Sequence, residues 1–435
     1  MNNFTGKKLS PAFWVPTLYF AEGLPFVAVA TVSVLMYKDM GLSDSQIAFF
    51  TTLIAWPWTL KPFWGPLLEM FKTKKYFVVA TQFIGGVAFG LLALTLPLSG
   101  FFKYSLVLFA IIAFNSATHD IAADGLYINV LSEKLQSRFI GWQGAFYNIA
   151  KVFSQGALVY IAGRLEVSAG VTQAWMIVMG IFGLVLLGLS LYHMKMLPAG
   201  NKAARVQNLN EAFSTFWDVV KTFFKKKNIW WAIAFIVFYR FAEGQAVKIV
   251  PLFLRSARTQ GGLGLSTSEI GIIYGVFGAA AFVLGSILAG YFTAKRGLKK
   301  SLFILACFFN IPFAVYAFLA ITTPTDFAII SLAVVFEYFG YGFGFVGLIL
   351  FMMQQIAPGK YKMAHYAFAT ALMNLGFMIP SMISGLLSDF LGYKNFFIWV
   401  IIATIPSFLV TWLVPFTEHI DEKAEKEEMK ASINE

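Results

Sequence analysis

Long apolar stretches, each about the length of a membrane-crossing helix, dominate this sequence. The run from Val78 to Leu98 contains no charged residue. A helix needs about 20 apolar residues to cross ~30 Å of hydrocarbon, whereas barrel strands need alternating polarity, which this run lacks. Only 13% of the residues are charged, against about a quarter in soluble domains. We therefore predict an all-α membrane protein.

Polar, Pro and Gly clusters divide the chain into twelve predicted transmembrane helices. The predicted spans are residues 12–37, 45–68, 76–98, 104–130, 138–162, 172–194, 229–254, 267–291, 301–321, 327–356, 363–387 and 393–415. The first stretch exceeds the length of a signal-peptide core and is followed by no small-residue cleavage site, so we expect it to be retained.

Two halves of the chain repeat each other. Tyr19–Gly23 (Tyr-Phe-Ala-Glu-Gly) returns as Arg240–Gly244 (Arg-Phe-Ala-Glu-Gly), and Gly41–Ile47 resembles Gly264–Ile270. Repeated helical units with a site at their interface are typical of transporters. The predicted domains are an N-terminal six-helix bundle (1–195), a linker with an amphipathic helix (196–228), a C-terminal six-helix bundle (229–417) and a charged tail (418–435).

Basic residues are distributed unevenly between the two sides of the predicted membrane. Of the 33 Lys and Arg residues, 23 lie on one side of the predicted membrane or at the span ends facing that side. Six lie on the other, namely Lys38, Lys103, Arg164, Arg255, Arg258 and Lys394, and the remaining four lie deeper within spans. This positive-inside bias predicts that both termini and the central loop are cytoplasmic. The same bias explains the net positive charge of the chain, so no nucleic-acid partner is needed to account for it.

The amphipathic segment from Leu209 to Phe224 is either an interfacial helix or a partner-docking helix.

Charged residues inside the spans are the candidate functional residues, because a charge at the bilayer centre costs about 2.5 to more than 10 kcal/mol. Asp120 and Asp124 lie one helical turn apart, and two buried carboxylates so close together form a credible proton site. A structural salt bridge to Lys61 or Lys151 is the alternative. The predicted proton-coupling residues are Glu22, Asp120, Asp124, Glu243 and Glu337.

Polar side chains on the same helices are the candidate solute ligands. Lys151 shares a polar stripe with Gly144, Asn148 and Gln155, and Arg240 is spaced to pair with Glu243. Acids and bases are nearly balanced, so the bases alone do not establish an anionic solute. The predicted substrate-binding residues are Tyr19, Lys61, His119, Asn148, Lys151, Gln155, Arg240, Lys248, Tyr338 and Asn374.

Several other chemistries find no support in the sequence. The spacing of His119, Asp120 and Asp124 is not a strong metal signature, no phosphate-binding loop for ATP occurs, and Cys307 is the single cysteine. We expect no metal, no cofactor and no enzymatic activity. Transport is then driven by an ion gradient or by the gradient of the solute itself. Protons suit the carboxylates better than sodium, although sodium stays open as an alternative.

The loop after the second span resembles a signature of the major facilitator superfamily. Residues 65–75 (Gly-Pro-Leu-Leu-Glu-Met-Phe-Lys-Thr-Lys-Lys) resemble Gly-x-x-x-Asp-(Arg)-x-x-Gly-Arg-Arg, with Glu69 for Asp and Thr73 for Gly. The second copy has Ala294 at the acidic position. The resemblance implies gating residues at Gly65, Glu69, Lys72, Lys74, Gly290 and Arg296.

Within that superfamily, the chain resembles AmpG-type muropeptide permeases and related acetyl-CoA transporters. The resemblance is carried by residues 20–25 (Phe-Ala-Glu-Gly-Leu-Pro), 61–69, 115–124 (Asn-Ser-Ala-Thr-His-Asp-Ile-Ala-Ala-Asp, with His119 replacing Gln), 239–243 (Tyr-Arg-Phe-Ala-Glu) and 336–337 (Phe-Glu). Glu22 stands where AmpG has a small residue. The resemblance singles out Lys61, Asp120, Asp124, Arg240, Glu243 and Glu337.

These observations predict a monomeric proton-coupled transporter in the bacterial inner membrane, with the bilayer, protons and a small polar solute as its partners. The expected solute contains sugar, most specifically a muropeptide of the GlcNAc-anhydroMurNAc type, which alternating access carries inward. The open alternatives are other oligosaccharides, acetyl-CoA-like anions, siderophores and multidrug export. A nontransporting receptor on the same fold also stays open.

Overall fold

The computed structural model of the chain describes residues 10–64, 68, 73–131, 133–198, 209–358 and 361–416. These residues form helices almost throughout, and no β-strand occurs among them. The prediction of an all-helical protein is therefore confirmed for the described part of the chain.

The helices of the first half, residues 10–198, follow the predicted stretches. They are η1 (Pro11–Phe13), α1 (Val15–Val27), η2 (Ala28–Val32), α2 (Ser33–Asp39), α3 (Asp44–Ile54), α4 (Trp56–Leu60), η3 (Lys61–Phe63), α6 (Lys74–Thr95), α7 (Phe101–Val130), α8 (Glu133–Lys151), η4 (Val152–Leu158), α9 (Val159–Ala169) and α10 (Val171–Met196). Two of these segments, η2 and η4, are π-helical, a form that is common at functional sites.

The second half, residues 229–416, follows α11 (Leu209–Phe224). Its helices are α12 (Ile229–Tyr239), α13 (Phe241–Arg255), η5 (Arg258–Gln260), α14 (Thr267–Ile272), η6 (Ile273–Gly278), α15 (Ala279–Arg296), α16 (Leu298–Asn310), η7 (Ile311–Phe313), α17 (Ala314–Thr322), α18 (Phe327–Phe351), η8 (Met352–Ile356), α19 (Lys362–Ile402) and α20 (Ile405–Leu413).

Eight helical stretches in the described part of the chain are long and apolar enough to cross a membrane. The predicted stretch 229–254 is not among them; the helix breaks at Arg240 between α12 and α13, and Arg240, Glu243 and Lys248 make this stretch more polar. The predicted stretches 363–387 and 393–415 fall largely within one continuous segment, in which Gly392 adopts φ 70° and kinks α19.

The sequence repeat corresponds to a repeated local structure. Ser43 and Gln46 form a capping box at the start of α3, and Ser266 and Glu269 form the equivalent box at the start of α14. Each box satisfies otherwise unpaired amide groups at the first turn of its helix. The two copies of the motif therefore begin equivalent helices in the two halves.

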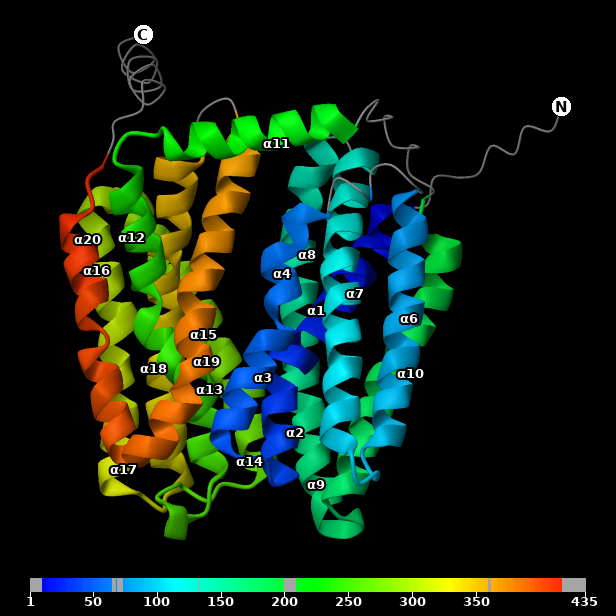
Figure 1. Ribbon diagram of the computed structural model, residues 1–435, viewed down its shortest axis with the longest axis vertical. Helices are drawn as coiled ribbons and strands as arrows, with labels where there is room; N and C mark the ends of the chain where they lie inside the picture. Colours follow the sequence, from blue (N-terminus) through cyan, green and yellow to red (C-terminus); the bar gives the residue numbers. More distant parts are fainter. Residues whose placement is uncertain are drawn as a thin grey trace, which may run out of the picture.

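The two halves lie side by side and α11 crosses one end of the molecule (Figure 1). Toward α11 the ribbons of the two halves diverge, whereas at the opposite end α2 and α3 approach α13 and α19, and α9 approaches α14. We call this opposite end the closed end. Thr222 on α11 lies 3.1 Å from the Nε2 of His365 on α19, so α11 packs against the second half.

Large apolar side chains cover the outer surface of the helices. Leu184, Leu332, Phe390 and Trp412 are exposed over 71%, 67%, 86% and 76% of their area. Exposure on this scale is unusual in a soluble monomer but natural for side chains that face lipid. Because lipid removes the hydrophobic driving force between helices, close packing must hold them together.

Candidate functional site

A cavity of about 260 Å³ lies between the two halves. Predicted ligands from both halves line it, namely Gln155, Arg240, Lys248, Tyr338 and Asn374, together with the predicted proton-coupling residue Glu243. Thr31, Thr52, Thr59, Trp58 and Phe377 also line it and were not predicted, because threonines and aromatics are too common in this chain to stand out. The cavity thus combines charged, amide, hydroxyl and aromatic groups.

Arg240 and Glu243 form a bidentate ion pair at the cavity wall. The Nε and Nη2 atoms of Arg240 lie 2.5 and 2.7 Å from the carboxylate oxygens of Glu243. The helix break at Arg240 sets the base one turn from the acid, and both side chains are more than 90% buried. The Arg240 guanidinium also lies 4.4 Å from the ring centre of Phe377, a favourable cation–π distance. The spacing-based prediction of this pair is confirmed.

Polar groups from the two halves meet across the cavity. The Nζ of Lys248 on α13 donates to the carbonyl oxygen of Ala30, 2.6 Å away in the π-helical segment η2. Gln155 in η4 and Tyr338 on α18, one from each half, both line the cavity. Lys248 is thus a buried base whose described partner is a carbonyl and not a carboxylate.

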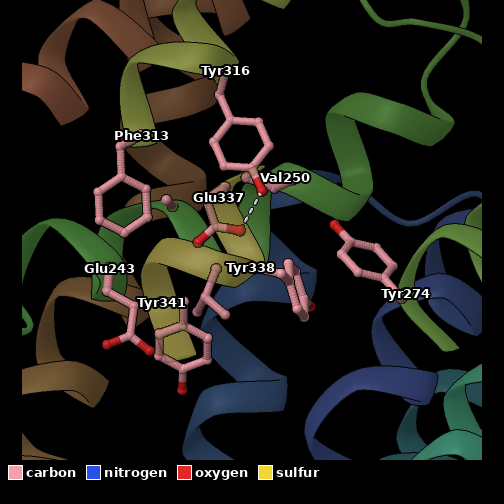
Figure 2. Close-up of a pocket in the computed structure, with 10 residues that line it drawn as sticks. Glu243, Val250, Tyr274, Phe313, Tyr316, Glu337, Tyr338 and Tyr341 are labelled. Carbon is pink, nitrogen blue, oxygen red and sulfur yellow. Dashed lines mark hydrogen bonds between the residues drawn. The ribbon is translucent and has the colours of Figure 1, made fainter. Parts of the chain in front are cut away.

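Glu337 lies in a smaller pocket of about 50 Å³ beside the main cavity. The hydroxyl group of Tyr316 on α17 donates to the Oε2 of Glu337 over 2.8 Å (Figure 2). Glu243 and Tyr341 lie on the side of Glu337 away from Tyr316, and Tyr274 and Tyr338 also line the pocket (Figure 2). The pocket therefore places the two predicted proton-coupling acids of the second half, Glu243 and Glu337, around one small space.

The three predicted proton-coupling acids of the first half, Glu22, Asp120 and Asp124, form a separate cluster on α1 and α7. The Nζ of Lys61 lies 3.2 Å from the Oδ2 of Asp120, and the hydroxyl group of Tyr19 donates to the Oδ1 of Asp124 over 2.9 Å. Glu22 on α1 lies beside these acids, and its Oε2 is buried without a hydrogen-bond partner. One lysine therefore faces a group of three carboxyl groups. The salt bridge between Lys61 and Asp120, considered as an alternative from sequence, is present.

The predicted stripe on α8 has mixed contacts. The Nζ of Lys151 lies 5.2 Å from the ring centre of Tyr147 and 6.0 Å from that of Phe282 in the other half. Asn148 donates to the carbonyl oxygen of Gly144 in its own helix. Of this stripe, Gln155 lines the cavity described above.

His119 belongs to an internal hydrogen-bonded chain and lines a different, smaller pocket. Its Nε2 lies 2.9 Å from the Nε2 of Gln82, whose Oε1 lies 2.9 Å from the Nδ1 of His193. The Nε2 of His193 in turn lies 2.9 Å from the hydroxyl oxygen of Thr17. Sequence reasoning missed this chain because its members come from α1, α6, α7 and α10.

The predicted gating residues are only partly described. Gly65, Glu69 and Lys72 lie outside the described residues. Lys74 is buried and its stem packs close to Gly125, and the guanidinium of Arg296 lies 4.9 Å from the ring centre of Phe292. Among the described residues, no group of three or more His, Cys, Asp or Glu side chains could hold a metal ion.

The model of the Major Facilitator Superfamily matches residues 17–364 and 249–434 of the chain. The chain is 21% identical to the anhydromuropeptide permease of Escherichia coli K12 over 398 residues, 90% of this chain and 77% of the permease. It is 21% identical to the putative transporter AmpG 4 of Rickettsia conorii over 419 residues, 92% of this chain and 95% of the relative.

Solved structures show the same fold. The crystal structure of a D-xylose–proton symporter matches with a TM-score of 0.72 at 14% identity, over 94% of this chain and 98% of the symporter. A bacterial homologue of the human lysosomal transporter Spinster, in an inward-facing and unoccupied conformation, matches with a TM-score of 0.67 at 16% identity, over 92% of this chain and 95% of the homologue. These likenesses concern the fold alone.

Proposed function

Because the chain belongs to the Major Facilitator Superfamily, and is therefore a transporter and not an enzyme, we propose that it imports a muropeptide together with protons. The proposed solute is of the GlcNAc-anhydroMurNAc type. The observation that carries this proposal is the similarity to the anhydromuropeptide permease along 90% of the chain, combined with a cavity of matching chemistry. The proposed location is a bacterial inner membrane, with a monomer as the working unit.

In the proposed topology, twelve helices cross the membrane as two six-helix bundles, residues 1–195 and 229–417. The linker 196–228 and the tail 418–435 are cytoplasmic, as the distribution of basic residues favours. The end near α11 then faces the cytoplasm and the closed end faces outward. Rocking of the two bundles about the central cavity would expose it to each side in turn.

The cavity chemistry suits a solute that carries both sugar rings and carboxylates. Tyr274, Tyr338 and Tyr341 present aromatic faces with polar hydroxyl groups, which is the character needed to pack on a sugar and bond to it. Lys248 has no carboxylate partner among the described residues and so offers a charge-assisted bond to a solute carboxylate. Asn374 and Gln155 supply amide donors and acceptors.

The carboxyl cluster of the first half supports proton coupling. Glu22, Asp120 and Asp124 bring three carboxyl groups together on α1 and α7, and a proton on one of them would remove one negative charge. Lys61 balances one further negative charge through Asp120. We propose that protons enter this cluster and that Glu243 and Glu337 serve the second half.

Uptake into proteoliposomes tests the proposal. Labelled anhydromuropeptide and a neutral disaccharide are compared with and without an inward proton gradient, in the natural protein and in Asp120→Asn. Asp326→Asn is the matched control, because Asp326 is an exposed helix cap at α18 and Asn caps a helix equally well. Gradient-driven muropeptide uptake that is lost only in Asp120→Asn is the expected result.

Other outcomes separate the alternatives. Disaccharide uptake without muropeptide uptake would keep the mechanism and change the solute to another oligosaccharide. Uptake of neither solute would contradict the proposal and direct the assay to acetyl-CoA-like anions, siderophores or drug export. Gradient-driven uptake that survives in Asp120→Asn would remove Asp120 from the coupling mechanism.

A further inference from the structure

A second group of charged side chains lies at the closed end, outside the central cavity. The Nε of Arg255, the last residue of α13, lies 2.5 Å from the Oδ1 of Asp39, the last residue of α2. The Nη2 of Arg255 lies 3.5 Å from the Oε2 of Glu166 on α9. The hydroxyl oxygen of Thr267 on α14 lies 3.0 Å from Asp39 and 3.3 Å from Glu166. We call these four residues the closed-end cluster. Its two acids belong to the first half of the chain, and Arg255 and Thr267 belong to the second.

The charges of the closed-end cluster do not balance. Two carboxyl groups share one guanidinium group, although the Asp39 side chain is fully buried and that of Glu166 is only 11% exposed. Both carboxyl groups contact the same guanidinium group and the same Thr267 hydroxyl group, so negative charges on both would lie close together and repel each other. The Oε1 of Glu166 is buried without a partner. A single proton would make the cluster neutral.

No other cation among the described neighbours supplies the missing charge. Trp175 on α10 gives Asp39 a neutral indole donor at 3.2 Å. Lys38, beside Asp39 on α2, pairs with Asp44 at 2.7 Å. The carboxylate of Glu269 on α14 accepts a hydrogen bond from the backbone N–H of Ser266. Arg164 on α9 is exposed to solvent.

We infer that Glu166 is a proton-binding site, and that a proton bound there holds the two halves together at the closed end. This site is distinct from the carboxyl groups around the central cavity and does not depend on the identity of the solute. When the halves separate, Arg255 and Thr267 leave with the second half. The carboxyl group of Glu166 is then exposed to water, which stabilises its ionised form, so the proton is released.

The direction of the pH effect follows from this difference. Burial, followed by the nearby charge of Asp39, raises the pKa of Glu166 from 4.5 to about 8 in the closed form. In the open form, contact with water returns the pKa toward its ordinary value. The closed form therefore binds the additional proton between these two values. Closure is favoured as pH falls through 8, by at most about tenfold per pH unit, and the added preference is complete below the open-form pKa.

Spin labels at the closed end would measure this equilibrium directly. Exposed Ala169, at the end of α9, and exposed Thr325, before α18, are replaced by Cys in a Cys307→Ala background. The distance between the labels is recorded from about pH 5.5 to 9.5, which brackets the raised pKa. We expect the short-distance population to fall as pH rises, with a midpoint near 8.

Three variants make the test specific. Glu166→Gln, which mimics the protonated form, should stay closed across the range. Asp39→Asn removes the competing carboxylate, so Arg255 can neutralise Glu166 and the midpoint should move to lower pH. Glu269→Gln removes a charge from α14 but keeps the capping box, because Gln also completes it, and should titrate like the natural protein.

Two results would overturn the inference. One is a label-to-label distance distribution of the natural protein that does not change with pH, and the other is a Glu166→Gln variant whose distances change with pH as those of the natural protein do. If Glu166→Gln does not fold, the test rests on the pH midpoint of Asp39→Asn. A midpoint equal to that of the natural protein would reject the site. The readout is conformational, so failure of muropeptide uptake would leave this test intact.

Discussion

A Cβ atom added to Gly275 would lie 2.0 Å from the Cα of Gly156. Gly156 lies in the π-helical segment η4 of the first half, and Gly275 lies in the π-helical segment η6 of the second. At Gly163 and Gly385, an added Cβ would likewise meet the opposite half, at Ser268 and Asp44. Small residues let helix backbones approach closely where lipid provides no hydrophobic drive. The two halves therefore meet backbone to backbone.

Gly275→Val should separate the halves at this contact. No flexible side chain can yield there, because the atoms within 3 Å of the added Cβ are backbone atoms of Gly156. We expect fewer closed molecules in the spin-label assay and at least about tenfold slower uptake, equivalent to about 1.4 kcal/mol. Gly180→Ala on α10, where an added Cβ meets nothing within 4 Å, should behave like the natural protein. A normal distance distribution in Gly275→Val would contradict the prediction.

Arg240→Met should destabilise the fold more than the loss of one contact would suggest. It leaves the buried Glu243 without its partner, and breaking a buried pair in this way costs about 3–5 kcal/mol. The double variant Arg240→Met/Glu243→Leu should recover most of the free energy of unfolding, measured by denaturant titration in detergent. If our assignment of Glu243 to coupling holds, the double variant still fails to accumulate solute. Recovery of gradient-driven uptake in the double variant would show that the pair is structural.

Lys248→Met should weaken binding of acidic solutes selectively. The substitution keeps the length of the side chain but removes the ammonium group that reaches across to Ala30. We expect the affinity for anhydromuropeptide to fall by about 10- to 100-fold, the range of one charge-assisted hydrogen bond. Binding of a neutral disaccharide should change little. Lys394→Met, at an exposed position of the closed end, is the control. Equal losses for both solutes would argue for a packing role of Lys248.

Glu337→Gln should uncouple solute movement from proton movement. Solute counterflow, which needs no net proton transfer, is expected to continue, whereas accumulation against a gradient is lost; a pH-sensitive dye in the liposomes records the protons. Tyr316→Phe is the matched variant, because it removes the 2.8 Å hydrogen bond but keeps the carboxyl group. It should retain coupling and lose about 1–3 kcal/mol of stability. Proton movement that persists in Glu337→Gln would exclude Glu337 from coupling.

Part of the candidate site was predictable because its geometry is local. Arg240 and Glu243 are three residues apart, and a helical turn brings such residues together wherever the helix lies. The carboxyl groups on α7 were found for the same reason, since Asp120 and Asp124 follow each other by one turn. The near identity of the two capping boxes also followed from the repeated sequence.

Contacts between distant segments could not be predicted in the same way. Glu166 and Arg255 lie near predicted span ends, where charges are ordinary, and nothing local indicates that they share Asp39. His119 looked like a cavity ligand because of its neighbours on α7. Its partner Gln82 lies on α6, so the packing of α6 on α7 determines what it contacts.

The sequence by itself determined that this chain is helical and crosses a membrane. The cost of placing polar backbone and charges in lipid acts on each stretch separately, so composition and length suffice to identify it. Only the tertiary structure decided which charges become partners, where the cavity lies and which end is closed. These properties depend on how the two halves approach each other, and that approach is set by close contacts such as Gly156 against Gly275, whose members lie far apart in the chain.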